Sequence, residues 1–330
     1  MHAGFQAPAP GLYSTAARGK VWSVLKKLKV AVLFGGASSE HEVSRMSATS
    51  VLNNLDTEKY DVLPVGITKD GRWYLYSGPV EDLCSGAWER HSGNVPAAIC
   101  PGSGLAGLVA FENGVCRSLP VDVVFPVLHG KNGEDGTIQG LLELAGLPYV
   151  GCGVLGSAVC MDKIIANRVM DATGIPRCEW DCMERWQRPE LAAIARRAAE
   201  KLGWPIFVKP ANAGSSVGIS KARDMAELEA AVDLALQHDS RVVFERFVQE
   251  VECAVRGNDE VSGTHPGEIL ASAEFYTYDD KYISGTSRVA IPAQLAQEKL
   301  DEVRDLAVRA YRALCCKGLA RVDFFVEHGT

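Results

Sequence analysis

The sequence predicts a fold that combines an α/β part with an α+β part, in a chain of 330 residues. From residue 29 to about residue 150, short β-branched runs that end in turns alternate with helical periodicities, which is typical of a parallel sheet covered by helices. After about residue 250, strand-like runs follow one another, which indicates a mostly antiparallel sheet. The length suggests two or three domains.

The composition is typical of a globular protein, with 47% hydrophobic and 23% charged residues. A net charge of −7 argues against nucleic-acid binding, and no stretch approaches the ~18 apolar residues of a membrane span. We therefore expect a cytoplasmic protein that binds neither nucleic acid nor a membrane. Ten cysteines form no CxxC motif and lack zinc-ligand spacing, so we expect them to be buried small side chains in a reducing compartment.

Residues 1–28 contain no continuous apolar segment, so we expect a disordered extension rather than a secretory signal. A first domain is expected over 29–150. Its periodic positions Ile138, Leu141, Leu142 and Ala145 predict a helix that Gly146 and Pro148 end. The expected elements are strands at 29–36, 60–67, 71–76 and 121–130, helices at 39–55 and 135–148, and a Gly- and Ser-rich loop near 85–110.

A second domain is expected over 151–245 and a third, incomplete one over 246–330. Asp224 and Glu227 have the spacing of a capping box, which predicts a helix start. Residues 327–330 resemble a hairpin turn for which no second strand follows. The expected elements are helices at 161–176, 224–237 and 294–314, and strands at 204–210, 241–248, 250–257, 267–275, 284–292 and 319–327.

Two polar clusters follow predicted strands of the first domain, where ligands bind in open α/β sheets. The first, GGASSEHEVS at 35–44, places Glu40 and Glu42 at a helix start. These carboxylates could bind a ligand, or they could cap the helix at its N-terminus, where the helix dipole favours negative charge. The second, LHGKNGEDGTIQG at 128–140, contains His129, which could line a ligand loop or be a satisfied structural histidine.

Two further clusters lie later in the chain. KPANAGSSVGISK at 209–221 surrounds small residues with lysines, which suits a backbone cradle for phosphate, although a flexible surface loop has the same composition. EFYTYDDKY at 274–282 is aromatic and acidic, and it could equally be a packed surface hairpin.

Several cations suit a substrate with several negative charges: Lys163, Lys209, Lys281 and Arg321. Asp323 lies two residues after Arg321 on a predicted strand, so both side chains should point to the same face. A carboxylate beside phosphate-binding cations is suited to Mg²⁺, although an ordinary salt bridge is the alternative. These residues favour a Mg-nucleotide enzyme.

Six segments, in order, resemble the D-alanine–D-alanine ligases of the ATP-grasp superfamily: GGASSEHEVS, LHGKNGEDGTIQG, DKIIANRVMDATGIP, VKPANAGSSVGISK, EFYTYDDKY and GLARVDFFVE. The resemblance runs from about Lys29 to Glu327. It implies an ATP-grasp fold, in which an N-terminal parallel α/β domain precedes two domains that clamp ATP. It also implies that ATP activates one D-alanine as an acyl phosphate, which a second D-alanine attacks to give the dipeptide for peptidoglycan.

The resemblance also implies roles for single residues. Glu40 would hold the ammonium group of the first D-alanine, close to His129. Ser215 and Tyr282 would be hydrogen-bonding partners that latch a mobile loop over the site, and Arg321 would stabilise the tetrahedral intermediate.

The resemblance implies that the nucleotide is ATP and that two Mg²⁺ ions, or Mn²⁺ in their place, bind with it. It assigns Asp323 as a metal ligand. The residues that it assigns to ATP are Lys163, Lys209, Ser215, Ser216, Glu245, Arg246, Val248, Glu252 and Lys281.

Two alternatives remain open, one about activity and one about the second substrate. The family continues past the VDFFVE strand into a strand with a Glu and an Asn that complete the two-metal site, so the chain could be an inactive ATP-binding fragment. The Lys281–Tyr282 pair resembles that of enzymes whose second substrate is an amine, which favours D-alanine while leaving D-serine open. The resemblance further implies a homodimer.

Overall fold

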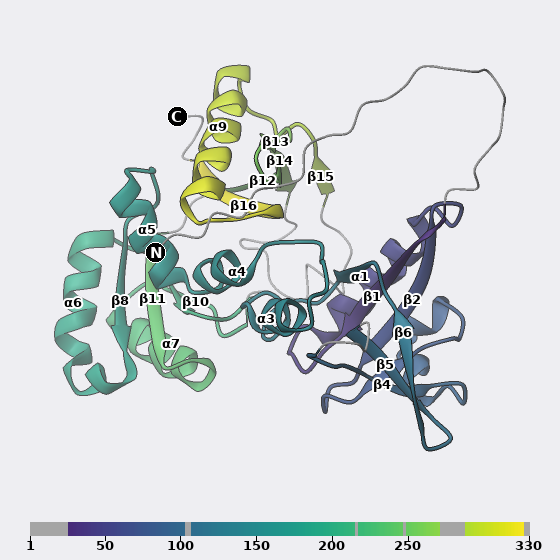
Figure 1. The fold of residues 1–330 in the computed structure, drawn as a ribbon. Coiled ribbons are helices and arrows are strands. Elements are labelled where there is room, and N and C mark those ends of the chain that lie inside the picture. The colour runs from purple at the N-terminus through teal and green to yellow at the C-terminus, as the bar shows by residue number, and fades with distance from the viewer. Residues whose placement is uncertain (1–25, 103–106, 215–216, 247–248, 271–287, 327–330) are drawn as a thin grey trace, which may run out of the picture.

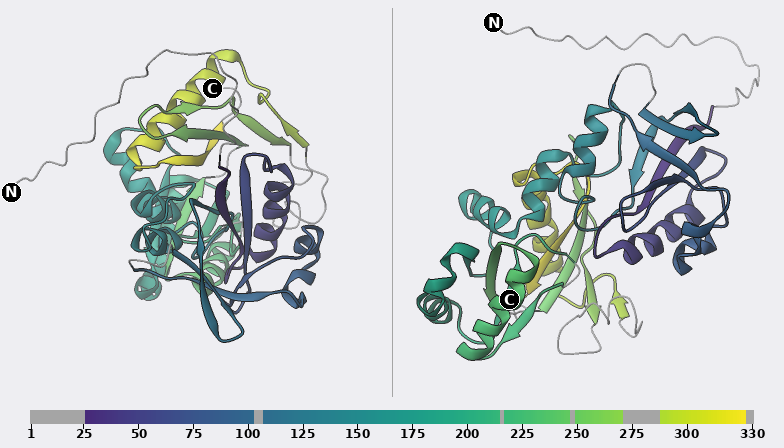
Figure 2. Two further views of the ribbon diagram at one scale, coloured as in Figure 1. Left: turned by 45° about the vertical axis from the view of Figure 1, so that its right-hand side comes forward. Right: turned by 90° about the horizontal axis from the view of Figure 1, so that it is seen from below.

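The computed structural model describes residues 26–102, 107–214, 217–246, 249–270 and 288–326, and their strands form three sheets (Figure 1). We call each sheet with its covering helices a unit. Helices α3 (Thr137–Leu144) and α4 (Val154–Met161) lie between the first sheet and the other two in Figure 1. Two further directions show α9 (Gln297–Ala313) beside the third sheet (Figure 2).

The first sheet is mixed, with the order β6-β5-β4-β3-β2-β1-β7. As predicted, β1 (Leu28–Gly35) pairs in parallel with β2 (Tyr60–Ile67) and with β7 (Val123–Pro126). Because β1 and β7 are parallel neighbours, the loops at their carboxyl ends meet at one edge of the sheet. The remaining strands pair antiparallel: β3 (Trp73–Leu75), β4 (Val95–Ile99), β5 (Gly107–Glu112) and β6 (Val115–Pro120).

The expectation of a loop near 85–110 is wrong for most of that stretch. A short helix α2 (Glu81–Ser85) and a 3₁₀ helix η1 (Ala87–Arg90) lead into β4, and β5 and β6 form a hairpin. Its turn holds Asn113 at φ 52° and Gly114 at φ 78°. Asn-Gly tolerates this left-handed backbone, which two-residue hairpin turns require.

Helices cover both faces of the first sheet. On one face, Ala48 of α1 (His41–Asn54) belongs to the same buried cluster as Phe34. On the other face, Leu142 of α3 packs in a cluster with Leu33. Neighbouring residues of β1 therefore face opposite cores, which explains its continuous apolar sequence.

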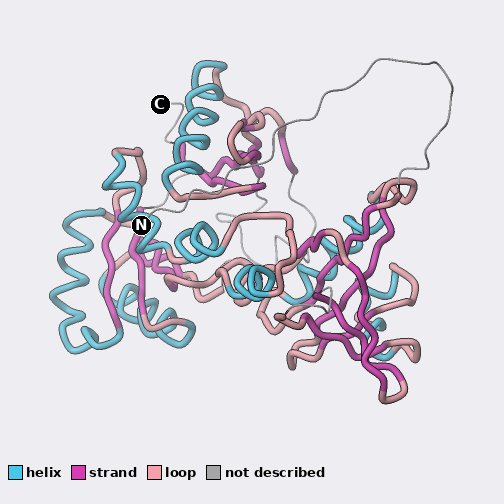
Figure 3. Tube along the Cα trace, in the orientation of Figure 1, coloured by secondary structure: helices cyan, strands magenta, loops and turns pink. Residues whose placement is uncertain are grey.

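The second sheet has the order β10-β9-β11-β8, and its described strands pair antiparallel. Helices α6 (Leu191–Leu202) and α7 (Met225–His238) cover its outer side (Figure 3). Asp224 caps α7 by accepting a hydrogen bond from the N–H of Glu227, as predicted. On the other face, α5 (Lys163–Thr173) contributes buried Ile164. The strands are β8 (Trp180–Glu184), β9 (Ile206–Pro210), β10 (Ser220–Ala222) and β11 (Arg241–Arg246), with a 3₁₀ helix η2 (Arg185–Glu190) after β8.

The third sheet is antiparallel among its described strands, as predicted. Its longest pairing joins β12 (Gln249–Gly257) to β16 (Gly318–Val326). Helix α9 covers one face, where Val322 and Phe324 pack into the core, so the alternate residues of β16 face the second unit. The remaining strands are β13 (Ser262–Gly263), β14 (Gly267–Leu270) and β15 (Arg288–Ala290).

Candidate active site

Glu40 lies where the first and second units meet. It is only 5% exposed, and its carboxylate accepts no capping hydrogen bond from α1, all of which the structure describes. A Cβ atom added at Gly130 or at Gly214 would lie 2.1 or 2.8 Å from Glu40 Oε2. The side chain therefore packs against the backbone of both loops, which contradicts the helix-cap interpretation of Glu40. Glu42 instead pairs with Lys69 at 2.6 Å.

His129 is held by its neighbours at the end of β7. Its Nε2 lies 3.0 Å from the hydroxyl of Ser47, and its Nδ1 lies 3.7 Å from Glu134 Oε1. The N–H of Gly130 donates to Glu134 at 2.7 Å. Burial would raise the pKa of Glu134, but these hydrogen bonds and the charges of His129 and Arg321 hold that pKa below its usual value. The structure thus places Glu134 in the site, although we did not predict it there. Its signal was the acidic pair within the glycine-rich loop.

Lys163 begins α5 and reaches the small-residue loop after β9. Asp162 caps the helix by accepting hydrogen bonds from two backbone N–H groups, and it also pairs with Arg241. The Nζ of Lys163 donates to the carbonyl oxygen of Ala213 at 2.6 Å. Burial and then the charge of Lys209 lower the pKa of Lys163 to about 8. This cation is thus positioned at the base of the loop that contains Ser215 and Ser216.

Lys209 and Glu245 form an ion pair on the inner face of the second sheet. Lys209 Nζ lies 2.7 Å from Glu245 Oε2, and the side chains are 15% and 12% exposed. Burial would raise the pKa of Glu245, but the charge and hydrogen bond of Lys209 outweigh it and lower that pKa. Lys209 Nζ also lies 5.4 Å from the ring centre of Phe325, within reach of a cation–π interaction. The second and third sheets therefore face each other here.

Arg321 and Asp323 point to the same face of β16, as predicted. Arg321 donates two hydrogen bonds to Asp323, at 2.8 and 3.0 Å. Arg321 Nη1 also lies 3.4 Å from Glu252 Oε1, and Glu252 stands opposite Asp323 in the β12–β16 pairing. The salt-bridge alternative for Asp323 is thus present in the structure. Because the charge of Arg321 also acts on Glu134, this cluster faces the first unit as well.

Five of the predicted site residues lie outside the described residues: Ser215, Ser216, Val248, Lys281 and Tyr282. Arg246 is described, and it is exposed at the end of β11. Within the described part of the chain, no three His, Cys, Asp or Glu side chains gather as a metal site. Asp323 with Glu252 opposite it fits one Mg²⁺, because that ion needs only one or two carboxylates beside substrate phosphates.

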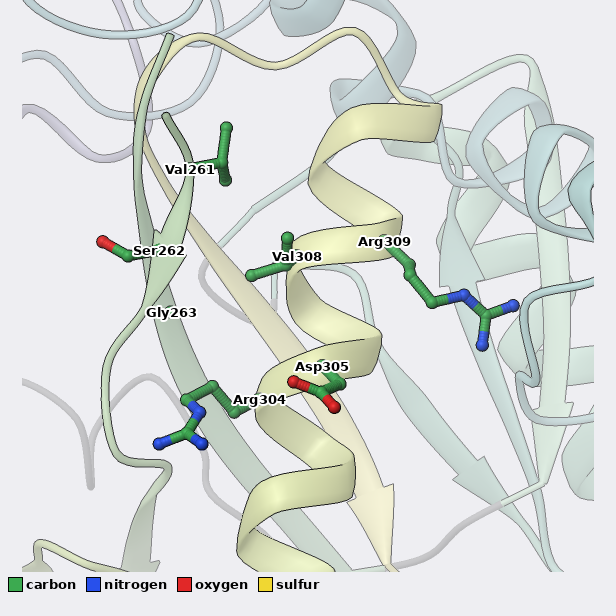
Figure 4. A pocket seen from close by; sticks show the side chains of 7 residues that line it. All are labelled: Val261, Ser262, Gly263, Arg304, Asp305, Val308 and Arg309. Carbon is green, nitrogen blue, oxygen red and sulfur yellow. The ribbon is translucent and has the colours of Figure 1, made fainter. Parts of the chain in front are cut away.

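A shallow hollow of the third unit lies away from these residues. It opens between β13 and α9, on the side of the sheet opposite Arg321 and Asp323 (Figure 4). None of its lining residues was predicted for the site. They are Val261, Ser262, Gly263, Arg304, Asp305, Val308 and Arg309.

Two sheets that face each other with lysines and carboxylates between them, joined to an α/β unit that contributes a buried Glu, define the ATP-grasp class of ligases. Family models described as the D-ala D-ala ligase N-terminus and C-terminus match residues 29–152 and 169–330. The chain therefore belongs to the D-alanine–D-alanine ligase family.

Similar proteins agree with this family. The chain is 49% identical to the D-alanine–D-alanine ligase of Caldicellulosiruptor bescii, across 93% of this chain and 84% of that protein. Among solved structures, the VanG D-Ala:D-Ser ligase from Enterococcus faecalis is 40% identical with a TM-score of 0.81, covering 92% of this chain and 88% of the other. The D-alanine–D-alanine ligase from Coxiella burnetii is 34% identical with a TM-score of 0.80, covering 92% of this chain and 81% of the other.

Two predictions about the whole chain can be compared with the structure. Among the described residues, no helix has the length and apolar character needed to cross a bilayer. The expectation of buried cysteines is wrong for several of the ten, all of which are described. Cys84, Cys116, Cys160 and Cys315 are exposed. Their positions on short edge strands, helix surfaces and turns lie outside the apolar periodicity that predicts a core.

Proposed function

We propose that this chain joins two D-alanine molecules in an ATP-dependent reaction, giving D-alanyl-D-alanine for peptidoglycan. The relatives named D-alanine–D-alanine ligase, at 48–49% identity over more than nine tenths of the chain, carry this proposal. The geometry of the site is consistent with it, because activation of a carboxylate by phosphoryl transfer needs positioning and charge more than a protein nucleophile.

The first D-alanine would bind in front of Glu40 and His129. Glu40 is buried between two loops, so its carboxylate is in place for an ammonium group before any substrate arrives. Gly214 directly precedes Ser215, and the contact between Glu40 and Gly214 supports the proposed latch of Ser215 and Tyr282 over the substrate. Such a latch would keep water from the acyl phosphate.

ATP would lie between the second and third sheets. Lys163 and Lys209 supply positive charge there, and the Ser215–Ser216 loop would close over the phosphates. Lys209 forms its ion pair with Glu245 in this structure. When ATP binds, the ammonium group of Lys209 would leave Glu245 and contact a phosphate instead. The other groups that we assign to ATP are Arg246, Val248, Glu252 and Lys281.

Arg321 would stabilise the negative charge of the tetrahedral intermediate, from the face that looks toward Glu134. Asp323 would hold Mg²⁺, with Mn²⁺ as a substitute. The ion would neutralise charge on the ATP phosphates. We propose a second ion on the resemblance alone.

D-serine is the second candidate for the attacking amine. The likeness to the VanG D-Ala:D-Ser ligase, with a TM-score of 0.81, favours testing it. A panel of D-alanine, D-serine and D-lactate at fixed ATP, with product masses as the readout, separates the candidates. A D-alanyl-D-serine product formed in preference to D-alanyl-D-alanine would change the assignment.

For the whole protein, we propose domains at 29–150, 151–245 and 246–330, a cytoplasmic location and a homodimer without nucleic-acid or membrane partners. Leu144 and Leu155, 74% and 61% exposed on α3 and α4, are apolar surface that a second copy could cover. Light scattering should give twice the mass of the 35.5 kDa chain. A monomer at micromolar concentration would remove the dimer from the proposal.

The decisive experiment is phosphate release from Mg-ATP with D-alanine, using L-alanine as the control. We expect release only with D-alanine, together with the dipeptide. Release that is equal with both amino acids, or absent with both, would contradict the proposed function.

A further inference from the structure

Helix α4 packs tightly on the segment that leads into β16. A Cβ atom added at Gly156 would lie 2.9 Å from the carbonyl oxygen of Cys315, and one at Gly318 would lie 2.7 Å from that of Gly151. Both glycines are therefore needed for close approach of two backbones that are distant in sequence. This contact joins α4, which precedes the second unit in the chain, to the third unit.

Three cysteine sulfurs gather at this contact. The Sγ atoms of Cys160 on α4 and Cys316 before β16 are 3.5 Å apart. Cys152 packs in the same cluster as Cys316, and its Sγ donates a hydrogen bond to the carbonyl oxygen of Leu319 at 3.7 Å. Cys160 is exposed, whereas Cys316 is only 8% exposed. The pair thus combines a sulfur that solvent reaches with a buried sulfur directly behind it.

The surroundings of these thiols differ. The hydrogen bond with Cys152 lowers the pKa of Cys316, but the hydrogen bond with Cys160 and burial outweigh it and raise that pKa to about 12. The hydrogen bond with Cys316 and burial raise the pKa of Cys152 above its usual range. Both inner thiols therefore keep their protons at neutral pH, and Cys160 is the sulfur that a dissolved oxidant meets first.

We propose that Cys160 and Cys316 form a reversible disulfide when hydrogen peroxide oxidises Cys160, and that this bond weakens ATP binding. The Cys160 sulfur attacks one peroxide oxygen, which gives a sulfenic acid and one water. The Cys316 thiol then attacks the Cys160 sulfur, so that an S–S bond forms and the S–OH bond breaks. The departing hydroxide accepts the proton of the Cys316 thiol and leaves as a second water. Two thiols are oxidised and one peroxide is reduced, so atoms and electrons balance.

The expected effect on ATP follows from where α4 ends. A disulfide has an S–S distance of ~2.05 Å, so the two sulfurs must approach by about 1.5 Å. Gly156 already touches the Cys315 carbonyl, so the middle of α4 cannot move closer. The movement therefore falls on the end of α4, which Asp162 and Lys163 follow directly. This step rests on the proposed role of Lys163 in ATP binding.

The linkage is tested on the full chain by peroxide treatment, alkylation and peptide mass spectrometry. We expect a Cys160–Cys316 peptide pair and a loss of two of the ten free thiols, both reversed by dithiothreitol. Cys160→Ser should abolish the pair, and Cys116→Ser, which removes an exposed cysteine of β6, should retain it. A different pair, or Cys160 oxidised to sulfinic acid without a cross-link, would overturn the proposal.

The consequence is tested by calorimetric titration of ATP into the reduced and the linked protein, without D-alanine. We expect severalfold weaker ATP binding by the linked form and unchanged binding by peroxide-treated Cys160→Ser. Equal affinities of the two wild-type forms would overturn the control of ATP binding. In the reduced protein, Lys163→Ala serves as a separate check. If it binds ATP normally, the proposed role of Lys163 has failed, and so has the predicted route from the disulfide to ATP.

Discussion

The two ion pairs of the proposed ATP site have different surroundings. Lys209 and Glu245 on the second sheet are 15% and 12% exposed, whereas Arg321 and Asp323 on the third are 58% and 36% exposed. Breaking a buried pair leaves an uncompensated charge, but an exposed pair contributes little to stability. A substitution at Lys209 therefore tests folding and binding together, whereas one at Arg321 can isolate chemistry.

The largest expected effect is that of Lys209→Ala. It leaves the Glu245 carboxylate largely buried without its main cation, so we expect a stability loss of about 3 kcal/mol as well as loss of ATP binding. Urea unfolding measures the first and titration calorimetry the second. Lys209→Met with Glu245→Gln should recover most of the stability but not the ATP binding. Equal stability of wild type and Lys209→Ala would contradict the proposed difference between the buried and the exposed ion pair.

Next comes Arg321→Ala. Turnover should fall by roughly a hundredfold, because the charge acts mainly when the intermediate forms. Unfolding stability should change by less than ~1 kcal/mol, since the pair with Asp323 is exposed. Steady-state phosphate release measures the turnover, and urea unfolding measures the stability. Arg321→Lys is the matched control that keeps the charge. Unchanged turnover in Arg321→Ala would remove the residue from its proposed role.

Gly130→Ala should have a smaller effect. Its φ of +67° and the 2.1 Å approach of Glu40 Oε2 leave no room for a methyl group, so Glu40 must move. We expect a loss of roughly 1–2 kcal/mol in stability and a higher KM for the first D-alanine, with the KM for ATP little changed. Gly140→Ala on α3, where a Cβ meets nothing within 4 Å, is the control. A higher KM for ATP alone would contradict the separation of the two subsites.

The smallest expected effect is a pH dependence of ATP binding. The pKa of Lys163 is lowered to about 8 by burial first and the Lys209 charge second, so Lys163 loses its proton as the pH rises through that value. ATP affinity should decline by up to about tenfold near pH 9, because binding then requires a proton to be taken up. Lys163→Arg should bind ATP without this decline. A flat profile in wild type would exclude Lys163 as the titrating group.

The sequence predicts the parts of the site that follow apolar strands. Glu40 and His129 come after β1 and β7, and Lys209 and Glu245 lie on β9 and β11, each at the positions that the strand pattern predicts. The shared face of Arg321 and Asp323 follows from the two-residue period of a strand.

Other features depend on contacts that a local pattern does not contain. Glu134 belongs to the site because the loop after β7 folds back on His129, and the spacing of the charges in that loop does not specify the fold-back. Strand β6 is the edge strand of the first sheet and is mostly exposed, so it lacks a clear hydrophobic period. The cysteine cluster depends on a contact between α4 and β16, which are far apart in the chain.

The position of Glu40 between two glycines has a consequence for natural variation. Its carboxylate fills the space that a methyl group would need at position 130 and at position 214, which belong to different units. These three positions should be inherited as a set. A lineage could accept a larger residue at 130 or 214 only after the side chain at position 40 had become shorter, and that change would alter how the first substrate is held.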